Sequence, residues 1–207
     1  MMPARVALVG VLVRLLAVHS ALLRGQPYHV RSGRAHRQID HVVCMAESTE
    51  PLQESGTPIE IDRFMGRWYV LAAIPTPLDK GAMNAIEDYA WDADAERIQV
   101  TYTMQRSKDG PVQKILQRAS LVNSPTNTRW SLDPKVLGLY LPLKLPYLVV
   151  DCAADYSTTI IGLPDRSILY VMARSPTVDE RCFGALLQTC FLNGYDLSKI
   201  ERVSHSV

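Results

Sequence analysis

The sequence predicts an all-β fold, in which eight antiparallel strands in up-and-down order close into a barrel with one α-helix packed outside it. Short segments that alternate apolar and polar residues follow one another between residues 66 and 174, separated by turn residues. Trp68 stands near the start of the first segment and Arg174 at the end of the last. These two side chains can meet only if the sheet closes, and closure also removes both exposed edges. A sandwich of two sheets is the alternative architecture.

The charge of the chain is unevenly distributed. The 207 residues have a net charge of +1, which predicts no polyanionic partner, and we expect no nucleic acid to bind. Residues 1–46 contain six Arg, no Lys and one acidic residue, whereas the remainder holds 16 basic and 20 acidic residues. A basic leader therefore precedes a mildly acidic body, whose length suits one domain.

Residues 1–45 are predicted to be a targeting leader that is removed. Residues 6–23 are apolar except for one Arg, one His and one Ser, and an Arg near the centre of a span costs roughly 2.5–3.5 kcal/mol on insertion scales. A permanent anchor is therefore disfavoured. The arginine-rich stretch that follows is typical of a plastid-type leader, with a secretory signal and a disordered basic tail as alternatives. Residues 46–58 are predicted to form a polar linker.

The barrel domain is predicted to span residues 59–202. It opens on a short helical turn that includes Phe64. The clearest strand covers residues 97–105, where apolar and polar side chains alternate without a break. The eight predicted strands comprise residues 66–75, 84–92, 97–105, 112–123, 127–133, 145–152, 156–163 and 167–174.

After the last strand the apolar period becomes helical. Thr177 is predicted to cap this helix, Glu180 to complete a capping box, and Gly194 to end the helix. Residues 195–200 are expected to return as a short extended segment, and residues 203–207 to fray as a tail. One apolar stripe of the helix should pack against the outside of the sheet: Cys182, Phe183, Leu186, Leu187, Cys190 and Phe191.

Three motifs in this order resemble those of the lipocalin family: Gly66-Arg67-Trp68, then Asp155-Tyr156 (preceded by Ala where the family has Thr), then Arg174. The resemblance covers residues 59–200 and implies an eight-stranded lipocalin barrel that carries a small hydrophobic ligand. It also implies structural roles for Gly66, Trp68, Asp155, Tyr156 and Arg174, with the Arg174 guanidinium stacked on the Trp68 indole at the closed end. Three stretches resemble more narrowly the group of bacterial lipocalins, plant temperature-induced lipocalins and apolipoprotein D: residues 74–81, 162–166 and 193–199.

Counting by twos along the strands predicts which side chains face the barrel interior. The predicted lining is apolar with a few phenolic hydroxyls, which suits a fatty acid, a lysolipid, a sterol or a carotenoid-like molecule. The alternative is that these side chains fill the barrel and leave no cavity. The predicted ligand-binding residues are Val70, Ala72, Ile74, Tyr89, Val100, Tyr102, Met104 and Tyr147.

Residues 136–147 form an apolar, proline-bearing connection between two strands, where exposure to water would favour polar residues. In related lipocalins the equivalent hairpin lies at the open mouth and is linked to membrane association. We expect this hairpin to contact a membrane surface, with a lid over the mouth or a dimer interface as alternatives. The predicted membrane tip consists of Leu137, Leu139, Tyr140, Leu141 and Leu143.

The cysteines give little support to an enzyme. Cys152 can be joined to Cys182 or Cys190 or stay reduced, and its neighbour Asp151 disfavours a reactive thiolate. We predict no metal site, no cofactor and no catalysis, and a monomer or weak homodimer. An isomerase-type barrel enzyme that uses a buried thiol is one alternative. A membrane-surface scaffold with a filled barrel is another. Protection of lipids under stress is a function implied by the resemblance alone.

Overall fold

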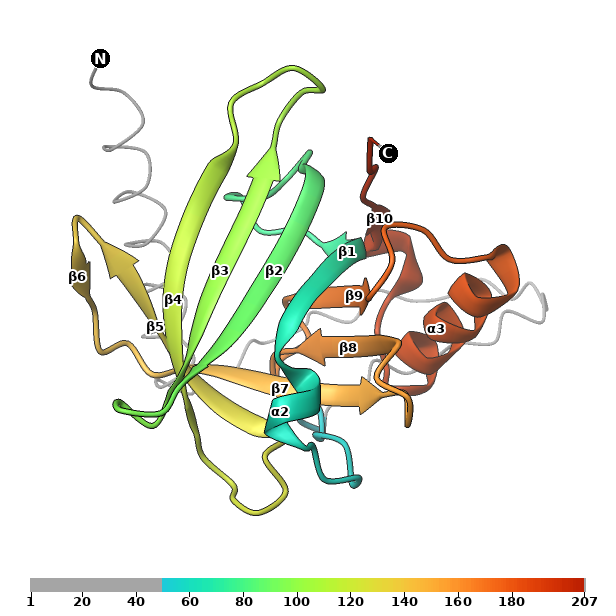
Figure 1. Ribbon diagram of the computed structural model, residues 1–207. Helices are drawn as coiled ribbons and strands as arrows, with labels where there is room; N and C mark the ends of the chain where they lie inside the picture. Colours follow the sequence, from blue (N-terminus) through green and yellow to red (C-terminus); the bar gives the residue numbers. More distant parts are fainter. Residues whose placement is uncertain (1–49, 207) are drawn as a thin grey trace, which may run out of the picture. The chain divides into compact units, whose positions relative to one another are not determined.

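Eight long antiparallel strands follow one another around a closed barrel in the computed structural model, which describes residues 50–206 (Figure 1). Pairing of the first strand with the last, from Tyr69 opposite Ala173 to Ile74 opposite Leu169, closes the sheet. The predicted barrel is therefore confirmed, and a two-sheet sandwich is wrong. The strands are β1 (Gly66–Ile74), β2 (Met83–Asp92), β3 (Arg97–Gln105), β4 (Gln113–Leu121), β5 (Arg129–Val136), β7 (Leu145–Cys152), β8 (Thr158–Gly162) and β9 (Leu169–Ala173).

Two short strands were not predicted. β6 (Leu139–Tyr140) pairs with the end of β5 and makes a hairpin that projects from the barrel (Figure 1). β10 (Glu201–Arg202) pairs with Ala72 and Ala73 of β1, on the side where β2 has diverged from β1.

Residues 201–206, here called the seam segment, fill the gap between β1 and β2. The Val203 amide donates to the Leu71 carbonyl at 2.9 Å, and the Asn84 amide donates to the Ser204 carbonyl at 2.8 Å. The Ser206 amide donates to the Asn84 side chain at 2.7 Å. The expectation of a frayed tail is therefore wrong for residues 203–206, because their backbone groups complete the barrel wall.

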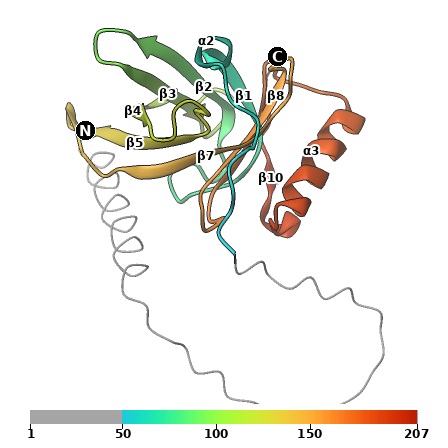
Figure 2. The same cartoon turned by 90° about the horizontal axis from the view of Figure 1, so that it is seen from below.

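The long helix α3 (Glu180–Leu192) lies outside the barrel, as predicted (Figure 2). Its N-cap is Asp179, two residues after the predicted cap at Thr177, because the Asp179 side chain accepts from the Cys182 amide at 2.7 Å. Gly194 ends the helix with φ of 80°, as expected. The buried stripe is narrower than predicted: Phe183, Leu186 and Cys190 are buried, whereas Phe191 is 39% exposed.

Two segments beside these elements differ from expectation. Part of the predicted polar linker packs on the barrel, since Leu52 is 2% exposed and its amide donates to the Pro164 carbonyl at 2.8 Å. The predicted extended return after the helix instead contains a 3₁₀ turn at Leu197–Lys199. A one-turn helix, α2 (Ile61–Phe64), covers one end of the barrel. The predicted leader, residues 1–45, lies outside the described residues.

Two hydrophobic clusters result from this arrangement. The inner cluster fills the barrel and includes Phe64, Trp68 and Trp130. The outer cluster lies between the sheet and α3 and includes Leu148 and Phe183. Side chains that alternate along one strand therefore enter different cores, and only those of the inner cluster face the barrel interior.

Candidate functional site

The closed end of the barrel is built on Trp68 and Arg174. The Arg174 guanidinium lies 3.7 Å from the centre of the Trp68 ring. It also donates to the carbonyl oxygens of Arg63, Met65 and Arg67 at 2.7, 2.9 and 2.8 Å. One cation therefore joins α2, the start of β1 and the end of β9, in agreement with a structural role.

The second motif supports the same end. The Tyr156 hydroxyl accepts from the Glu60 amide at 2.8 Å, and the Tyr156 carbonyl accepts from the Arg174 guanidinium at 3.3 Å. The Asp155 carboxylate stabilises the turn between β7 and β8 by accepting from the Ser157 amide and hydroxyl at 2.9 and 2.6 Å. Gly66 has φ of 93°, a conformation that favours glycine. All five motif residues thus contact or shape the barrel floor.

Six of the eight predicted ligand-binding residues belong to the inner cluster, and two do not. A register shift between Val70 and Ala72 on β1 reverses the alternation, so that Ala73 faces inward. Ala72 and Ile74 pack instead in the outer cluster, and their assignment to the barrel interior is corrected. The residues in the inner cluster are Val70, Tyr89, Val100, Tyr102, Met104 and Tyr147.

Aromatic side chains occupy the interior next to the floor. Trp130 stacks on Tyr147 with ring centres 5.2 Å apart and an interplanar angle of 12°. Phe64 meets the edges of Tyr89 and Trp130 at 5.5 and 5.2 Å. Trp130 was absent from the predicted lining, although its place in a predicted strand was the available signal. The lower part of the barrel is therefore filled by the protein's own rings.

A buried carboxyl group, that of Glu87, contacts two of these rings. It was not predicted from the sequence as a site residue. The side chain is 3% exposed and accepts from the hydroxyls of Tyr89 and Tyr147, the latter at 3.1 Å. Burial raises the pKa of Glu87 to about 7, although both phenols act in the opposite direction. Its position two residues before Tyr89 on β2 was the signal that placed it on the inner face.

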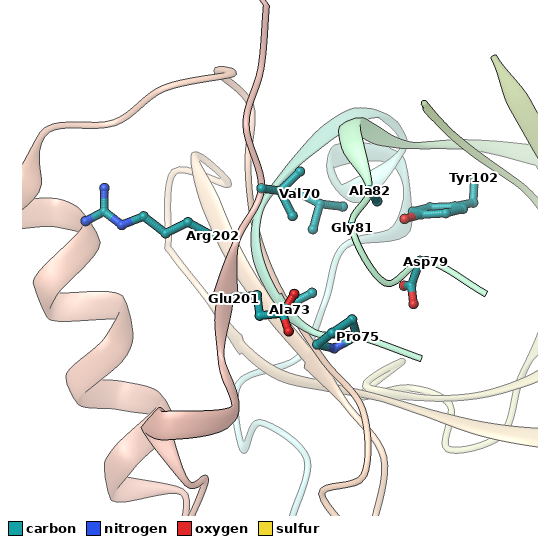
Figure 3. Close-up of a pocket in the computed structure, with 10 residues that line it drawn as sticks. Val70, Ala73, Pro75, Asp79, Gly81, Ala82, Tyr102, Glu201 and Arg202 are labelled. Carbon is teal, nitrogen blue, oxygen red and sulfur yellow. The ribbon is translucent and has the colours of Figure 1, made fainter. Parts of the chain in front are cut away.

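A cavity of about 40 Å³ lies where β1 and β2 diverge (Figure 3). Val70 and Ala73 of β1 line one side, and Tyr102 of β3 and Asp79 of the β1–β2 loop line another. The seam segment covers it. The cavity thus joins inward-facing residues of the barrel to a polar corner formed by Tyr102 and Asp79.

The three cysteines within residues 50–206 are free thiols, and two of them, Cys152 and Cys190, are poorly suited to nucleophilic catalysis. Burial raises the pKa of Cys152 to about 11 and that of Cys190 to about 12. Neither thiol is ionised near neutral pH, and the thiolate is the nucleophile. No group of three or more metal-ligating His, Cys, Asp or Glu side chains occurs within residues 50–206.

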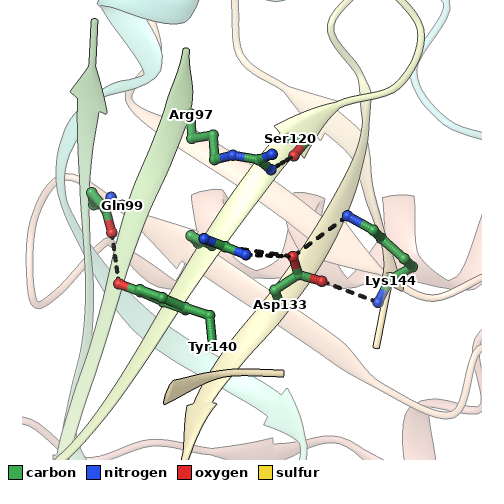
Figure 4. A network of polar contacts seen from close by, with 7 residues as sticks. Arg97, Gln99, Ser120, Asp133, Tyr140 and Lys144 are labelled. Atoms are coloured by element: carbon green, nitrogen blue, oxygen red, sulfur yellow. Dashed lines mark hydrogen bonds and ion pairs between the residues drawn. The ribbon is translucent and has the colours of Figure 1, made fainter. Parts of the chain in front are cut away.

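The predicted membrane tip divides into exposed and packed residues. Leu137 and Leu139 are each 71% exposed. Tyr140 folds back on the sheet, where its hydroxyl donates to Gln99 at 3.0 Å (Figure 4). Leu141 and Leu143 are half-buried. Only Leu137 and Leu139 therefore form an exposed apolar tip.

Cations surround the base of this tip. The Arg118 and Lys135 side chains lie over the Tyr140 ring at 4.6 and 5.1 Å. Arg118 and Lys144 both approach the buried Asp133 carboxylate at 3.5 Å (Figure 4). The hairpin thus combines two exposed leucines with three basic side chains.

The barrel, its indole-blocked floor and its external helix define a small-molecule carrier fold. The chain belongs to the lipocalin-like family, whose domain model matches residues 59–205. Temperature-induced lipocalin-1 of Arabidopsis thaliana is 26% identical over 156 residues, which cover 72% of this chain and 80% of the relative. The outer membrane lipoprotein Blc of Escherichia coli K12 is 25% identical over 139 residues, covering 66% and 74%.

Solved structures agree on the fold. Insecticyanin of the tobacco hornworm Manduca sexta superposes with a TM-score of 0.56 at 17% identity, covering 76% of this chain and 84% of its own. The lipocalin fold and these relatives imply binding of a small hydrophobic ligand, since the family consists generally of binding and transport proteins. Among residues 50–206, no helix has the length and apolar character needed to span a bilayer.

Proposed function

We propose that this lipocalin binds a small hydrophobic molecule at the open part of its barrel and acts as a carrier rather than an enzyme. The observation that carries the proposal is the closed barrel with an apolar inner face and a cavity beside Val70 and Tyr102. A ligand larger than the cavity requires inner side chains to move. Met104 is suited to this because its unbranched chain changes rotamer readily.

A neutral fluorophore whose emission rises in apolar surroundings is expected to bind the purified protein at about one molecule per chain. Apolar competitors should displace it, because they bury surface against the same inner face. Titration followed by fluorescence measures both quantities. Absence of saturable binding, with the barrel folded by circular dichroism, would contradict the carrier function.

We further propose that the carrier works at a membrane surface through Leu137 and Leu139. Leu137 has φ of 50°, a conformation that residues other than glycine rarely adopt, and its side chain is exposed to water. Insertion into a bilayer interface would bury it, and the nearby Lys135 and Lys144 favour anionic headgroups. The similarity to an outer membrane lipoprotein is compatible with this role.

Replacing both Leu137 and Leu139 with aspartate is expected to weaken binding to anionic liposomes at least about tenfold. Burying one leucine contributes roughly 1.5–3 kcal/mol, and the new carboxylates are repelled by the headgroups. Liposome flotation measures the effect. Val122→Asp, in an exposed position (57%) of the β4–β5 loop at the other end of the barrel, is the matched control. Equal loss in both variants would argue against a specific tip.

Protection of lipids under stress is proposed from the similarity to a temperature-induced plant lipocalin. A plastid location, with secretion as the alternative, remains the prediction from residues 1–45. A second candidate function, a membrane-surface scaffold with a filled barrel, is favoured by the stacked Trp130 and Tyr147 rings. A protein with this function would bind liposomes but would show no saturable binding of an apolar fluorophore.

A further inference from the structure

One hydroxyl beside the cavity lacks a partner. Tyr102 is 4% exposed, and its hydroxyl makes no hydrogen bond within the described residues 50–206. In Figure 3 the ring lies across the pocket from Val70, and the hydroxyl is directed toward Ala82. The hydroxyl oxygen is not among the fully buried atoms that lack a partner, so it opens onto the cavity, where water or the polar group of a bound molecule can satisfy it.

A fixed carboxylate stands next to this hydroxyl. Asp79 is 4% exposed, and its Oδ1 accepts from the Thr76 amide and hydroxyl at 2.5 and 2.6 Å. Its Oδ2 accepts only from the Tyr170 hydroxyl, at 2.6 Å. Each carboxylate oxygen can accept two bonds, so Oδ2 retains capacity for one further donor.

We propose that the cavity seats the head group of the hydrophobic ligand, and that this head group donates hydrogen bonds and carries no negative charge. An ammonium group fits best, a hydroxyl group fits next, and a carboxylate is rejected. The inference rests on the proposed carrier function and deepens it. It predicts a ligand class that excludes fatty acids.

The charges around the cavity support this selection. Asp79 and Glu87 are both buried on the inner side, and the described chain buries no Lys or Arg. Arg106, at the rim, donates to the Leu78 and Lys80 carbonyls at 2.6 and 2.9 Å. A ligand carboxylate would therefore be repelled by Asp79, which lines the cavity, and by the nearby Glu87, while two donors of Arg106 are already engaged with backbone carbonyls.

Arg202 also lines the cavity, but its charge is directed elsewhere. Its guanidinium pairs with the Glu180 carboxylate at 2.6 Å, lies 4.0 Å from the Phe183 ring centre, and points away from the pocket toward the helix (Figure 3). The volume of about 40 Å³ exceeds the roughly 10–15 Å³ that one water requires, so an ammonium or hydroxyl group fits while an acyl chain must extend into the barrel.

Three twelve-carbon competitors with different head groups test the proposal directly. Dodecylamine, 1-dodecanol and dodecanoate, each below its micelle concentration at pH 7.5, are titrated against the neutral fluorophore bound to the full chain. We expect dodecylamine to displace it at the lowest concentration and dodecanoate to need at least about tenfold more. Dodecanoate that competes as well as dodecylamine would overturn the inference.

Tyr102→Phe isolates the unpartnered hydroxyl. Because this hydroxyl bonds to no described residue, its removal should leave the melting temperature unchanged or raise it. The affinity for dodecylamine and dodecanol is expected to fall roughly three- to tenfold, while that for dodecanoate stays the same. Tyr140→Phe, on the outer hairpin, is the control and should alter none of the three affinities.

The outcomes separate this inference from the proposed function. Equal competition by all three head groups, or unchanged affinities in Tyr102→Phe, overturns the head-group seat and leaves the carrier function standing. Failure of the fluorophore and of all three competitors to bind overturns both.

Discussion

Replacing Arg174 with alanine is expected to lower the free energy of unfolding by about 3 kcal/mol. The substitution removes a cation–π contact with Trp68, worth about 0.5–2 kcal/mol, and charge-assisted hydrogen bonds to carbonyls of residues 63–67. The loss is large because these bonds join both ends of the chain's sheet at one point. Urea denaturation followed by tryptophan fluorescence measures it.

Arg67→Ala is the matched control for this substitution. The Arg67 side chain is 54% exposed and pairs with Asp88 on the surface at 2.9 Å, so its removal should cost no more than about 1 kcal/mol. Arg174→Lys keeps the charge but cannot reach several carbonyls together, and should recover less than half of the loss. Equal effects of Arg174→Ala and Arg67→Ala would refute the structural role of Arg174.

Glu87 is expected to make the protein less stable as the pH rises. Its pKa is raised from 4.5 to about 7 by burial, so the folded state favours the neutral carboxyl. The contribution of Glu87 to the free energy of unfolding is therefore fully present below about pH 4.5 and is lost as the pH rises through 7. One pKa unit corresponds to about 1.4 kcal/mol, so the loss between these limits is about 3 kcal/mol.

Glu87→Gln should remove this dependence, because glutamine does not ionise and can still accept from the phenols of Tyr89 and Tyr147. Chemical denaturation of both proteins between pH 4.5 and 8.5 yields the difference curve. The free energy of unfolding of the variant, relative to that of the wild type, should rise by about 3 kcal/mol from the low to the high end of this pH range. Asp94→Asn, an exposed site in the β2–β3 turn, controls for the loss of one surface carboxylate. A flat difference curve for Glu87→Gln would show that the buried carboxyl ionises as it does in water.

Much of the fold was predictable because each strand carries its own signal. The alternation of residues 97–105 and the turns between segments located all eight long strands within a few residues. The meeting of Trp68 and Arg174 then distinguished a barrel from a sandwich. The local alternation and the expected contact between Trp68 and Arg174 were sufficient to predict the fold, because both are compatible with the same closed barrel.

The site was less predictable, because it depends on contacts between distant elements. The β-bulge after Val70 shifts the alternation of β1 by one residue, so that the side chains after it change faces. No residue type at this position indicates a bulge. Glu87 was missed because a carboxylate is rarely buried, although the alternation along β2 places it on the same face as Tyr89; its burial depends on phenol partners from β2 and β7. The corner formed by Asp79 and Tyr102 exists only because a loop folds onto β3.

The seam segment has a consequence for synthesis. β1 pairs with β9 and β10 only after the ribosome has translated about a hundred further residues. Until then the apolar inner face of the unfinished barrel is exposed to water, where it can bind chaperones or aggregate. The barrel wall is therefore complete only after residues 201–206 have been translated, so the fold forms late in synthesis.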